Sequence, residues 1–113
     1  MKDKSFCIAN WKMYLNNIES INFIKKFIKY DFSLNNNCEI VICPSFTSIP
    51  LLIDLIDSNN ITFGSQDISN YEKGAFTGEI SFTMLEELNC QWSIVGHSER
   101  RQLLGESNPI VAN

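Results

Sequence analysis

Two short segments of the chain carry residue types that could act on an anionic molecule with a carbonyl group. In the first segment, Asn10 and Lys12 stand two residues apart directly after an apolar stretch. In an extended chain, side chains two residues apart project to the same side. An amide beside an ammonium at the mouth of a strand suits an anionic ligand. The same spacing also fits a surface lysine next to an asparagine in a turn, and it does not separate the two interpretations.

The second segment contains His97, which is the only histidine and follows another apolar stretch. Ser98 and Glu99 can open a helical turn there, and the positive end of a helix disfavours protonation of a nearby histidine. A neutral imidazole can donate a hydrogen bond to a carbonyl oxygen. Alternatively, His97 only caps the helix and Glu99 forms an ordinary surface ion pair with Arg100 or Arg101.

A third segment, residues 74–79, places an aromatic residue between two glycines inside a long loop. Long loops in compact domains are usually functional, and Phe76 and Thr77 could enter a pocket on a partner protein. The loop could equally pack on its own subunit. The preceding residues 64–67 do not form a phosphate-cradling motif, and the sequence contains no glycine-rich nucleotide loop.

The elements that must position these segments alternate along the chain. Strand-length apolar stretches are expected at residues 6–9, 39–43, 61–64 and 92–96. Between and after them, helices are expected to begin with caps at Asn16 or Asn17, Ser48, Ser81 and Asn108. This βαβαβαβ order predicts an α/β domain with a parallel sheet and right-handed crossovers. In such sheets reactive side chains lie at the carboxyl ends of the strands, where Asn10 and His97 stand.

The composition argues against several classes of protein. A net charge of −4 and a pI of about 4.8 argue against a nucleic-acid partner, which requires a concentrated basic surface. No apolar stretch approaches the ~18 residues of a membrane span, and the first residues do not resemble a signal peptide. The four cysteines lack paired C-x-x-C spacing. We therefore expect reduced, mostly buried thiols in a cytoplasmic protein, with no metal site.

Four segments together resemble, in order, the signature segments of the triosephosphate isomerase family. They are Asn10-Trp11-Lys12-Met13, Gly64-Ser65-Gln66-Asp67, Gly74-Ala75-Phe76-Thr77-Gly78-Glu79 with Met84-Leu85, and Gly96-His97-Ser98-Glu99-Arg100-Arg101. The resemblance covers the whole chain but only about the first half of the family's length. It implies a (β/α)8 TIM barrel, of which residues 1–113 supply the first four βα units and stop at the start of the fourth main helix. Tyr14, Ser65 and Asp67 depart from the family's usual Asn, Ala and Asn.

The resemblance also implies a reaction. The family interconverts dihydroxyacetone phosphate and glyceraldehyde 3-phosphate through an enediolate, in glycolysis and gluconeogenesis, without metal or cofactor. It implies His97 as the neutral electrophile that polarises the carbonyl. Lys12 would stabilise the developing anion and help to hold the phosphate, while Asn10 would orient Lys12 and contact substrate. Glu99 would lie near Lys12 without contacting substrate, and Ser98 would lie in the same outer layer of the site.

The resemblance further implies an assembly and a missing part. The loop of residues 66–80, with Phe76, Thr77, Gly78 and Glu79 near its tip, resembles the family segment that inserts into the other subunit of a homodimer. The family's general base, lid loop and phosphate-gripping amides lie beyond Asn113, so we expect this chain alone to be inactive and marginally stable. Two other interpretations remain. One is a non-catalytic half-barrel that serves as a structural or interaction module, and the other is a flavodoxin-like binding domain with coincidental motifs.

Overall fold

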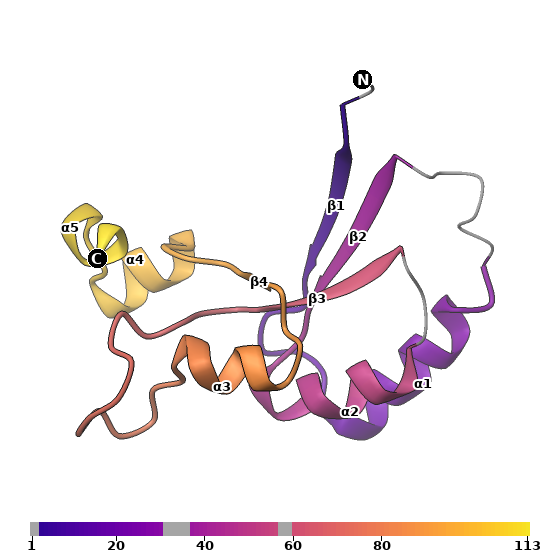
Figure 1. Ribbon diagram of the computed structural model, residues 1–113, viewed down its shortest axis with the longest axis horizontal. Helices are drawn as coiled ribbons and strands as arrows, with labels where there is room; N and C mark the ends of the chain where they lie inside the picture. Colours follow the sequence, from indigo (N-terminus) through magenta and orange to yellow (C-terminus); the bar gives the residue numbers. More distant parts are fainter. Residues whose placement is uncertain (1–2, 31–36, 57–59) are drawn as a thin grey trace.

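The computed structural model describes residues 3–30, 37–56 and 60–113, and within them parallel strands alternate with helices (Figure 1). The strands are β1 (Ser5–Asn10), β2 (Cys38–Cys43), β3 (Ile61–Ser65) and β4 (Trp92–Ser93). They pair in the order β1-β2-β3-β4, and every pair is parallel. The predicted parallel α/β sheet is therefore confirmed, in the curled half-barrel arrangement of the first βα units of a TIM barrel.

The helices of the described residues are short, and α1, α3 and α4 begin with side-chain capping hydrogen bonds. They are α1 (Asn17–Phe27), the 3-10 helix η1 (Phe46–Ser48), α2 (Ile49–Leu55), α3 (Phe82–Glu87), α4 (Ser98–Leu104) and α5 (Asn108–Ala112). The predicted cap of α1 is confirmed, because the Asn16 side chain accepts a hydrogen bond from the Glu19 backbone N–H at 3.0 Å. Glu19 Oε1 reciprocally accepts from the Asn16 N–H at 3.4 Å, which completes a capping box. Among residues 3–30, 37–56 and 60–113, no helix is long and apolar enough to cross a membrane.

The predicted cap of α3 by Ser81 is confirmed by the hydrogen bond that its hydroxyl accepts from the Met84 N–H, whereas one other predicted cap differs from the structure. Ser48 is the N-cap residue of α2, as predicted, although its side chain makes no capping hydrogen bond to that helix. Its hydroxyl instead donates to Asn17 Oδ1 at 2.7 Å and so joins η1 to α1. The N-cap of α5 is Ser107, which places Asn108 inside the helix.

The fourth strand is shorter than predicted. Residues 92–96 were expected to be strand, but β4 consists of Trp92 and Ser93 alone. One further backbone hydrogen bond, from Ile94 N–H to Ser65 C=O at 2.9 Å, continues the pairing. Because β3 ends at Ser65, the residues after Ile94 have no ladder partner on that strand.

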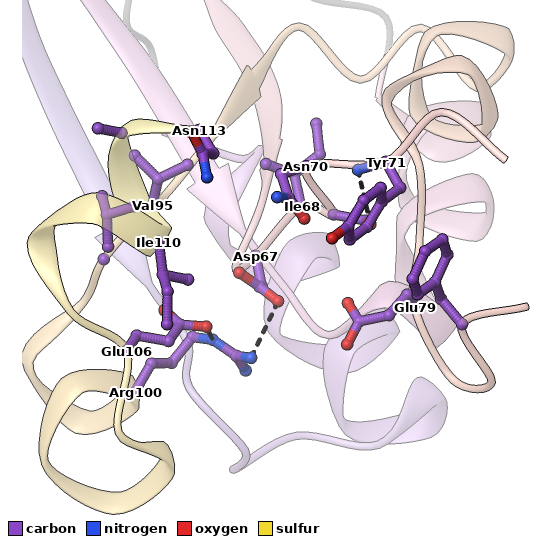
Figure 2. A pocket seen from close by; sticks show the side chains of 15 residues that line it. Asp67, Ile68, Asn70, Tyr71, Glu79, Val95, Arg100, Glu106, Ile110 and Asn113 are labelled. Carbon is purple, nitrogen blue, oxygen red and sulfur yellow. Dashed lines mark hydrogen bonds and ion pairs between the residues drawn. The ribbon is translucent and has the colours of Figure 1, made fainter. Parts of the chain in front are cut away.

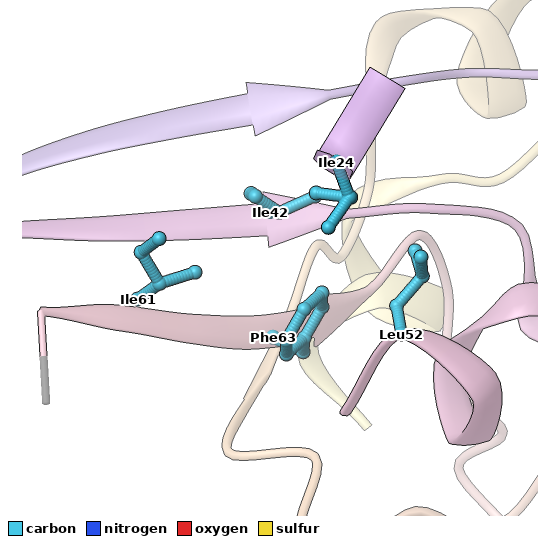
Figure 3. Packing of buried hydrophobic residues seen from close by; sticks show 5 residues of the cluster. All are labelled: Ile24, Ile42, Leu52, Ile61 and Phe63. Atoms are coloured by element: carbon cyan, nitrogen blue, oxygen red, sulfur yellow. The ribbon is translucent and has the colours of Figure 1, made fainter. Parts of the chain in front are cut away.

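The hydrophobic core lies between one face of the sheet and the first two helices (Figure 3). It is built from Ile24 of α1, Leu52 of α2, Ile42 of β2, and Ile61 and Phe63 of β3, each at most 6% exposed. Burying a side chain of this size contributes roughly 1.5–3 kcal/mol relative to leaving it exposed. This packing holds α1 and α2 on the outer face and aligns the carboxyl ends of the strands.

The opposite, inner face of the sheet is curled enough for its two edge strands to touch. The rings of Phe6 on β1 and Trp92 on β4 meet edge to face, with centroids 5.4 Å apart, although β2 and β3 lie between these strands. Trp92 Nε1 donates to Thr62 Oγ1 at 3.0 Å, and Thr62 Oγ1 donates to Glu39 Oε1 at 3.0 Å. Lys4 Nζ lies 2.6 Å from Glu39 Oε2, and this hydrogen bond is the main reason that the pKa of Glu39 is lowered.

The expectation of mostly buried cysteines is wrong. All four are free thiols, but only Cys43 is buried, and burial raises its pKa to about 11. Cys38 and Cys90 are half-buried, and Cys7 is exposed. Cys7 lies on β1, which is an edge strand and therefore has a neighbouring strand on one side only.

Gly64 allows a test of how tightly side chains pack on the inner face of the sheet. A Cβ at this position would lie 2.8 Å from Cys43 Sγ and 3.1 Å from Trp92 Cβ. We expect Gly64→Ala to lower the free energy of unfolding by about 1–3 kcal/mol, the range for overpacking, as measured by urea denaturation. In a Cys43→Ala background the cost should shrink because Sγ is gone. An equal cost in both backgrounds would contradict the overpacking explanation.

Candidate active site

The carboxyl ends of the strands bring both chemistry-bearing segments to one cavity. Asn10 is the last residue of β1, and His97 immediately precedes α4. Asn10, Lys12, His97 and Glu99 line this cavity together with Met13, Ser45, Phe46, Gln66, Asp67 and Arg100. Residues far apart in the sequence thus meet where a parallel α/β sheet is expected to hold its reactive groups.

An ion pair joins the two segments. Lys12 Nζ lies 2.8 Å from Glu99 Oε1. This hydrogen bond, together with the attraction between the charges, raises the pKa of Lys12 and lowers the pKa of Glu99. The side chains are 43% and 47% exposed, so water screens the pair and its contribution to stability is small. The pair fixes the position of the ammonium. The alternative pairing of Glu99 with Arg100 or Arg101 is not formed.

His97 is both a helix cap and a potential donor. Its Nδ1 accepts a hydrogen bond from the Glu99 backbone N–H at 3.2 Å at the start of α4, so the predicted place at a helix N-terminus is confirmed. A ring nitrogen that accepts carries no proton, and the proton of the neutral ring then lies on Nε2. The capping role therefore leaves Nε2–H to face a ligand. Glu99 Oε2 lies 3.5 Å from Nδ1. Ser98 is the exposed first residue of α4 and does not line the cavity.

The backbone at Lys12 differs from the expectation of an extended chain. β1 ends at Asn10, and Lys12 has a φ of 53°, in the left-handed region. A residue other than glycine held in this region costs on the order of 1–3 kcal/mol, which its surroundings must offset. Asn10 Oδ1 accepts a hydrogen bond from the Lys12 N–H at 2.9 Å and so turns the chain locally. Asn10 and Lys12 share the cavity because of this turn and not because of strand alternation.

Gln66 was missed by the sequence analysis. It directly follows β3, and its Nε2 donates to Lys12 C=O at 2.7 Å and to Cys43 C=O at 3.0 Å. The only signal in the sequence was its place just beyond a predicted strand. Neither of its partners is close in sequence, so local spacing could not reveal them.

A second ionic cluster connects α4 to the loop that follows β3. Arg100 Nη2 lies 3.2 Å from Asp67 Oδ2, and Arg100 Nε donates to Glu106 Oε2 at 2.8 Å. Figure 2 shows the Arg100 guanidinium between these carboxylates, in a neighbouring cavity that Glu79 also lines. Burial raises the pKa of Asp67; Arg100 acts in the opposite direction, while Glu106 and Glu79 add to the rise. Within the described part of the chain, no group of three or more His, Cys, Asp or Glu residues could hold a metal ion.

The residues predicted at an interface lie on an exposed loop. Residues 70–79, which include Thr77, Gly78 and Glu79, are all exposed, and Figure 1 shows the loop projecting away from the sheet. Phe76 stacks on Tyr71 of the same loop with ring centroids 3.9 Å apart and remains 40% exposed. Phe76 therefore packs within its own loop and still presents part of its ring to the surface.

Comparison with known proteins identifies the family. The family model described as triosephosphate isomerase matches residues 5–113. The chain belongs to the triosephosphate isomerase family. Its curated relatives of this name include those of Dictyoglomus turgidum, 45% identical over 103 residues, Aquifex aeolicus, 41% identical over 103 residues, and Corynebacterium glutamicum, 38% identical over 118 residues.

These triosephosphate isomerase relatives are considerably longer than this chain. The matches cover 91%, 91% and 99% of this chain but 41%, 41% and 44% of the respective relatives. The chain therefore spans about two fifths of the length of the relatives it matches. Family membership agrees with the place of the cavity, because TIM barrels carry their active sites at the carboxyl ends of the strands.

Asp67 gives this site a pH-dependent effect on stability. Because burial raises its pKa in the folded chain, the folded state binds this proton more tightly than the unfolded chain does. Above the folded pKa the carboxylate therefore lowers stability. We expect Asp67→Asn to raise the free energy of unfolding at pH 7, because the amide carries no charge to desolvate and Arg100 keeps Glu106 as its partner. The gain should disappear as pH falls below the ordinary aspartate value of 3.8.

Urea denaturation from pH 3 to pH 8 measures this difference. Glu72→Gln is a suitable control, because Glu72 is an exposed carboxylate in the same loop. A stabilisation by Asp67→Asn that grows as the pH falls would contradict the sign of the effect.

Proposed function

We propose that this chain supplies the electrophile and the anion-stabilising lysine of a triosephosphate isomerase active site. The reaction would interconvert dihydroxyacetone phosphate and D-glyceraldehyde 3-phosphate by proton transfer through an enediolate, within cytoplasmic glycolysis and gluconeogenesis. The main support is that, in a member of this family, Lys12, Glu99 and His97 meet in one cavity with Lys12 Nζ 2.8 Å from Glu99 Oε1.

Each side chain has a role that its contacts permit. His97 Nε2–H would donate to the substrate carbonyl oxygen while Nδ1 stays on the Glu99 N–H. The Lys12 ammonium, held by Glu99, would stabilise the negative charge that develops on the enediolate and attract the phosphate. Asn10 holds the Lys12 backbone through Oδ1, which leaves its Nδ2 amino group to contact substrate. No metal or cofactor enters this proposal.

The proton acceptor would come from outside these 113 residues. The carboxylates that line the cavity are Asp67 and Glu99. Lys12 lowers the pKa of Glu99 and makes it a weaker base. Burial raises the pKa of Asp67, but its carboxylate is held in an ion pair by Arg100. The base, the lid and the phosphate-gripping amides would then belong to the part of the family's length that this chain does not cover.

Because the base would lie outside this chain, we expect the chain alone not to isomerise glyceraldehyde 3-phosphate measurably faster than the buffer does. General base catalysis by itself contributes ~10²–10⁴-fold. A coupled dehydrogenase assay would measure the rate. Joining residues 1–113 to the remaining part of the Dictyoglomus turgidum relative should restore activity, and His97→Gln in that chimaera should lower kcat by roughly 10²–10³-fold.

Each result discriminates between interpretations. Isomerisation by the chain alone would show that it holds its own base. A folded but inactive chimaera would favour the alternative, in which the half-barrel is a non-catalytic structural or interaction module.

The same proposal includes a homodimer through the loop of residues 66–80. The stacked pair of Tyr71 and Phe76 presents a preorganised aromatic tip, which reduces the entropy lost on binding. In the chimaera, we expect Phe76→Ala to weaken the dimer by roughly 30-fold or more, as loss of an interface hot spot does. Analytical ultracentrifugation would measure the dissociation constant.

Phe23 supplies a matched control for this variant. It is similarly exposed, at 46% against 40% for Phe76, and also takes part in aromatic contacts, but it lies on α1. Equal dimerisation of Phe76→Ala, Phe23→Ala and the unchanged protein would exclude the loop as the dimer contact.

A further inference from the structure

Lys12 is held in a strained backbone conformation by two side-chain amides. With φ at 53°, it lies in the left-handed region that residues other than glycine rarely adopt. Its N–H donates to Asn10 Oδ1, which is a contact between residues two positions apart. Its C=O accepts a hydrogen bond from Gln66 Nε2 at 2.7 Å, across 54 positions of the sequence. The second contact ties the turn to the rest of the fold.

The Gln66 carboxamide joins three strand ends. Besides Lys12 C=O, its Nε2 donates to Cys43 C=O at 3.0 Å, and Cys43 is the last residue of β2. Cys43 C=O also accepts from the Trp11 N–H at 3.0 Å, so the turn after β1 and the end of β2 meet at this carbonyl. A carboxamide nitrogen has two N–H donors, and Gln66 uses one for each carbonyl. Gln66 itself is the first residue after β3.

We propose that Gln66 is a positioning residue that fixes the Lys12 turn and thereby the place where the lysine ammonium meets Glu99. The connection runs from β3 through Gln66 Nε2 to Lys12 C=O, and from Lys12 Nζ to Glu99 Oε1 at 2.8 Å. Gln66 touches no reacting atom in this scheme. Its importance for catalysis rests on the function proposed for Lys12, but its effect on Lys12 does not.

Other side chains cannot reproduce both hydrogen bonds. A glutamate at this position would offer only acceptors to the Lys12 and Cys43 carbonyls at neutral pH. A methionine would fill a similar volume without any N–H donor. An asparagine keeps the amide but is shorter by one methylene and cannot be expected to span both carbonyls.

The test measures the titration of the Lys12 ammonium by NMR in the 113-residue chain with labelled lysine side chains. In the unchanged chain, the hydrogen bond to Glu99 raises the pKa of Lys12. With Gln66→Met we expect this pKa to move down towards the ordinary lysine value, and the pKa of Glu99 to move up, because the ammonium no longer stays on the carboxylate. The other lysines should titrate as before.

Ser65→Ala is the matched control. Ser65 is the neighbour of Gln66 at the same strand end and is fully buried, and its hydroxyl donates to Ser93 Oγ at 2.8 Å. Its replacement should lower stability and leave the Lys12 titration unchanged. If Gln66→Met also lowers stability but leaves the Lys12 titration unchanged, Gln66 is only structural and the proposal is overturned.

Two further results keep the test decisive. If Gln66→Met does not fold, the milder Gln66→Asn is judged by the same criterion, and an unshifted Lys12 titration overturns the proposal. The NMR readout does not depend on catalysis. A shifted Lys12 titration in Gln66→Met therefore supports the positioning role even where the chimaera proves inactive, an outcome that would remove the proposed isomerase function alone.

Discussion

The ion pair between Lys12 and Glu99 joins the first strand of the sheet to the helix that follows the fourth, and the rest of the site depends on it. The two side chains can meet at 2.8 Å only because the sheet curls, as the contact between Phe6 and Trp92 on its inner face demonstrates. The pair itself adds little stability, because both groups remain close to half exposed. Its effect is geometric, since it holds the Lys12 ammonium on Glu99, whose other carboxylate oxygen lies 3.5 Å from His97 Nδ1.

That geometry is set by the backbone around the pair. Lys12 adopts a left-handed conformation, and His97 caps α4 through Nδ1, so each residue has its orientation determined by main-chain contacts. Asn10 and Gln66 hold the N–H and the C=O of Lys12 respectively. Such support leaves the ends of the Lys12 and His97 side chains directed into the same cavity.

Two of the three residues that depart from the usual family pattern, Ser65 and Asp67, lie close to the site and have partners within the fold. The Ser65 hydroxyl is fully buried and finds a partner in Ser93. The Asp67 carboxylate faces Arg100, which also binds Glu106. Both residues lie where β3 meets the loop that follows it.

The parallel α/β order, the approximate strands and the caps at Asn16, Ser81 and His97 could be predicted from the sequence, because these depend on hydrophobic periodicity and on hydrogen bonds between near neighbours. Lys12 and His97 could also be predicted as candidate site residues, because each follows a predicted strand. Spacing along the chain left the partner of Glu99 open, and only the resemblance placed it near Lys12. The 2.8 Å ion pair itself, the exposure of Cys7 and the hydrogen bond from Gln66 to the Lys12 turn follow from the tertiary structure. Gln66 and Lys12 lie 54 positions apart in the sequence, and Lys12 and Glu99 lie farther apart still. These contacts exist only once the strands are in register and the sheet has curled, and no local pattern encodes that closeness.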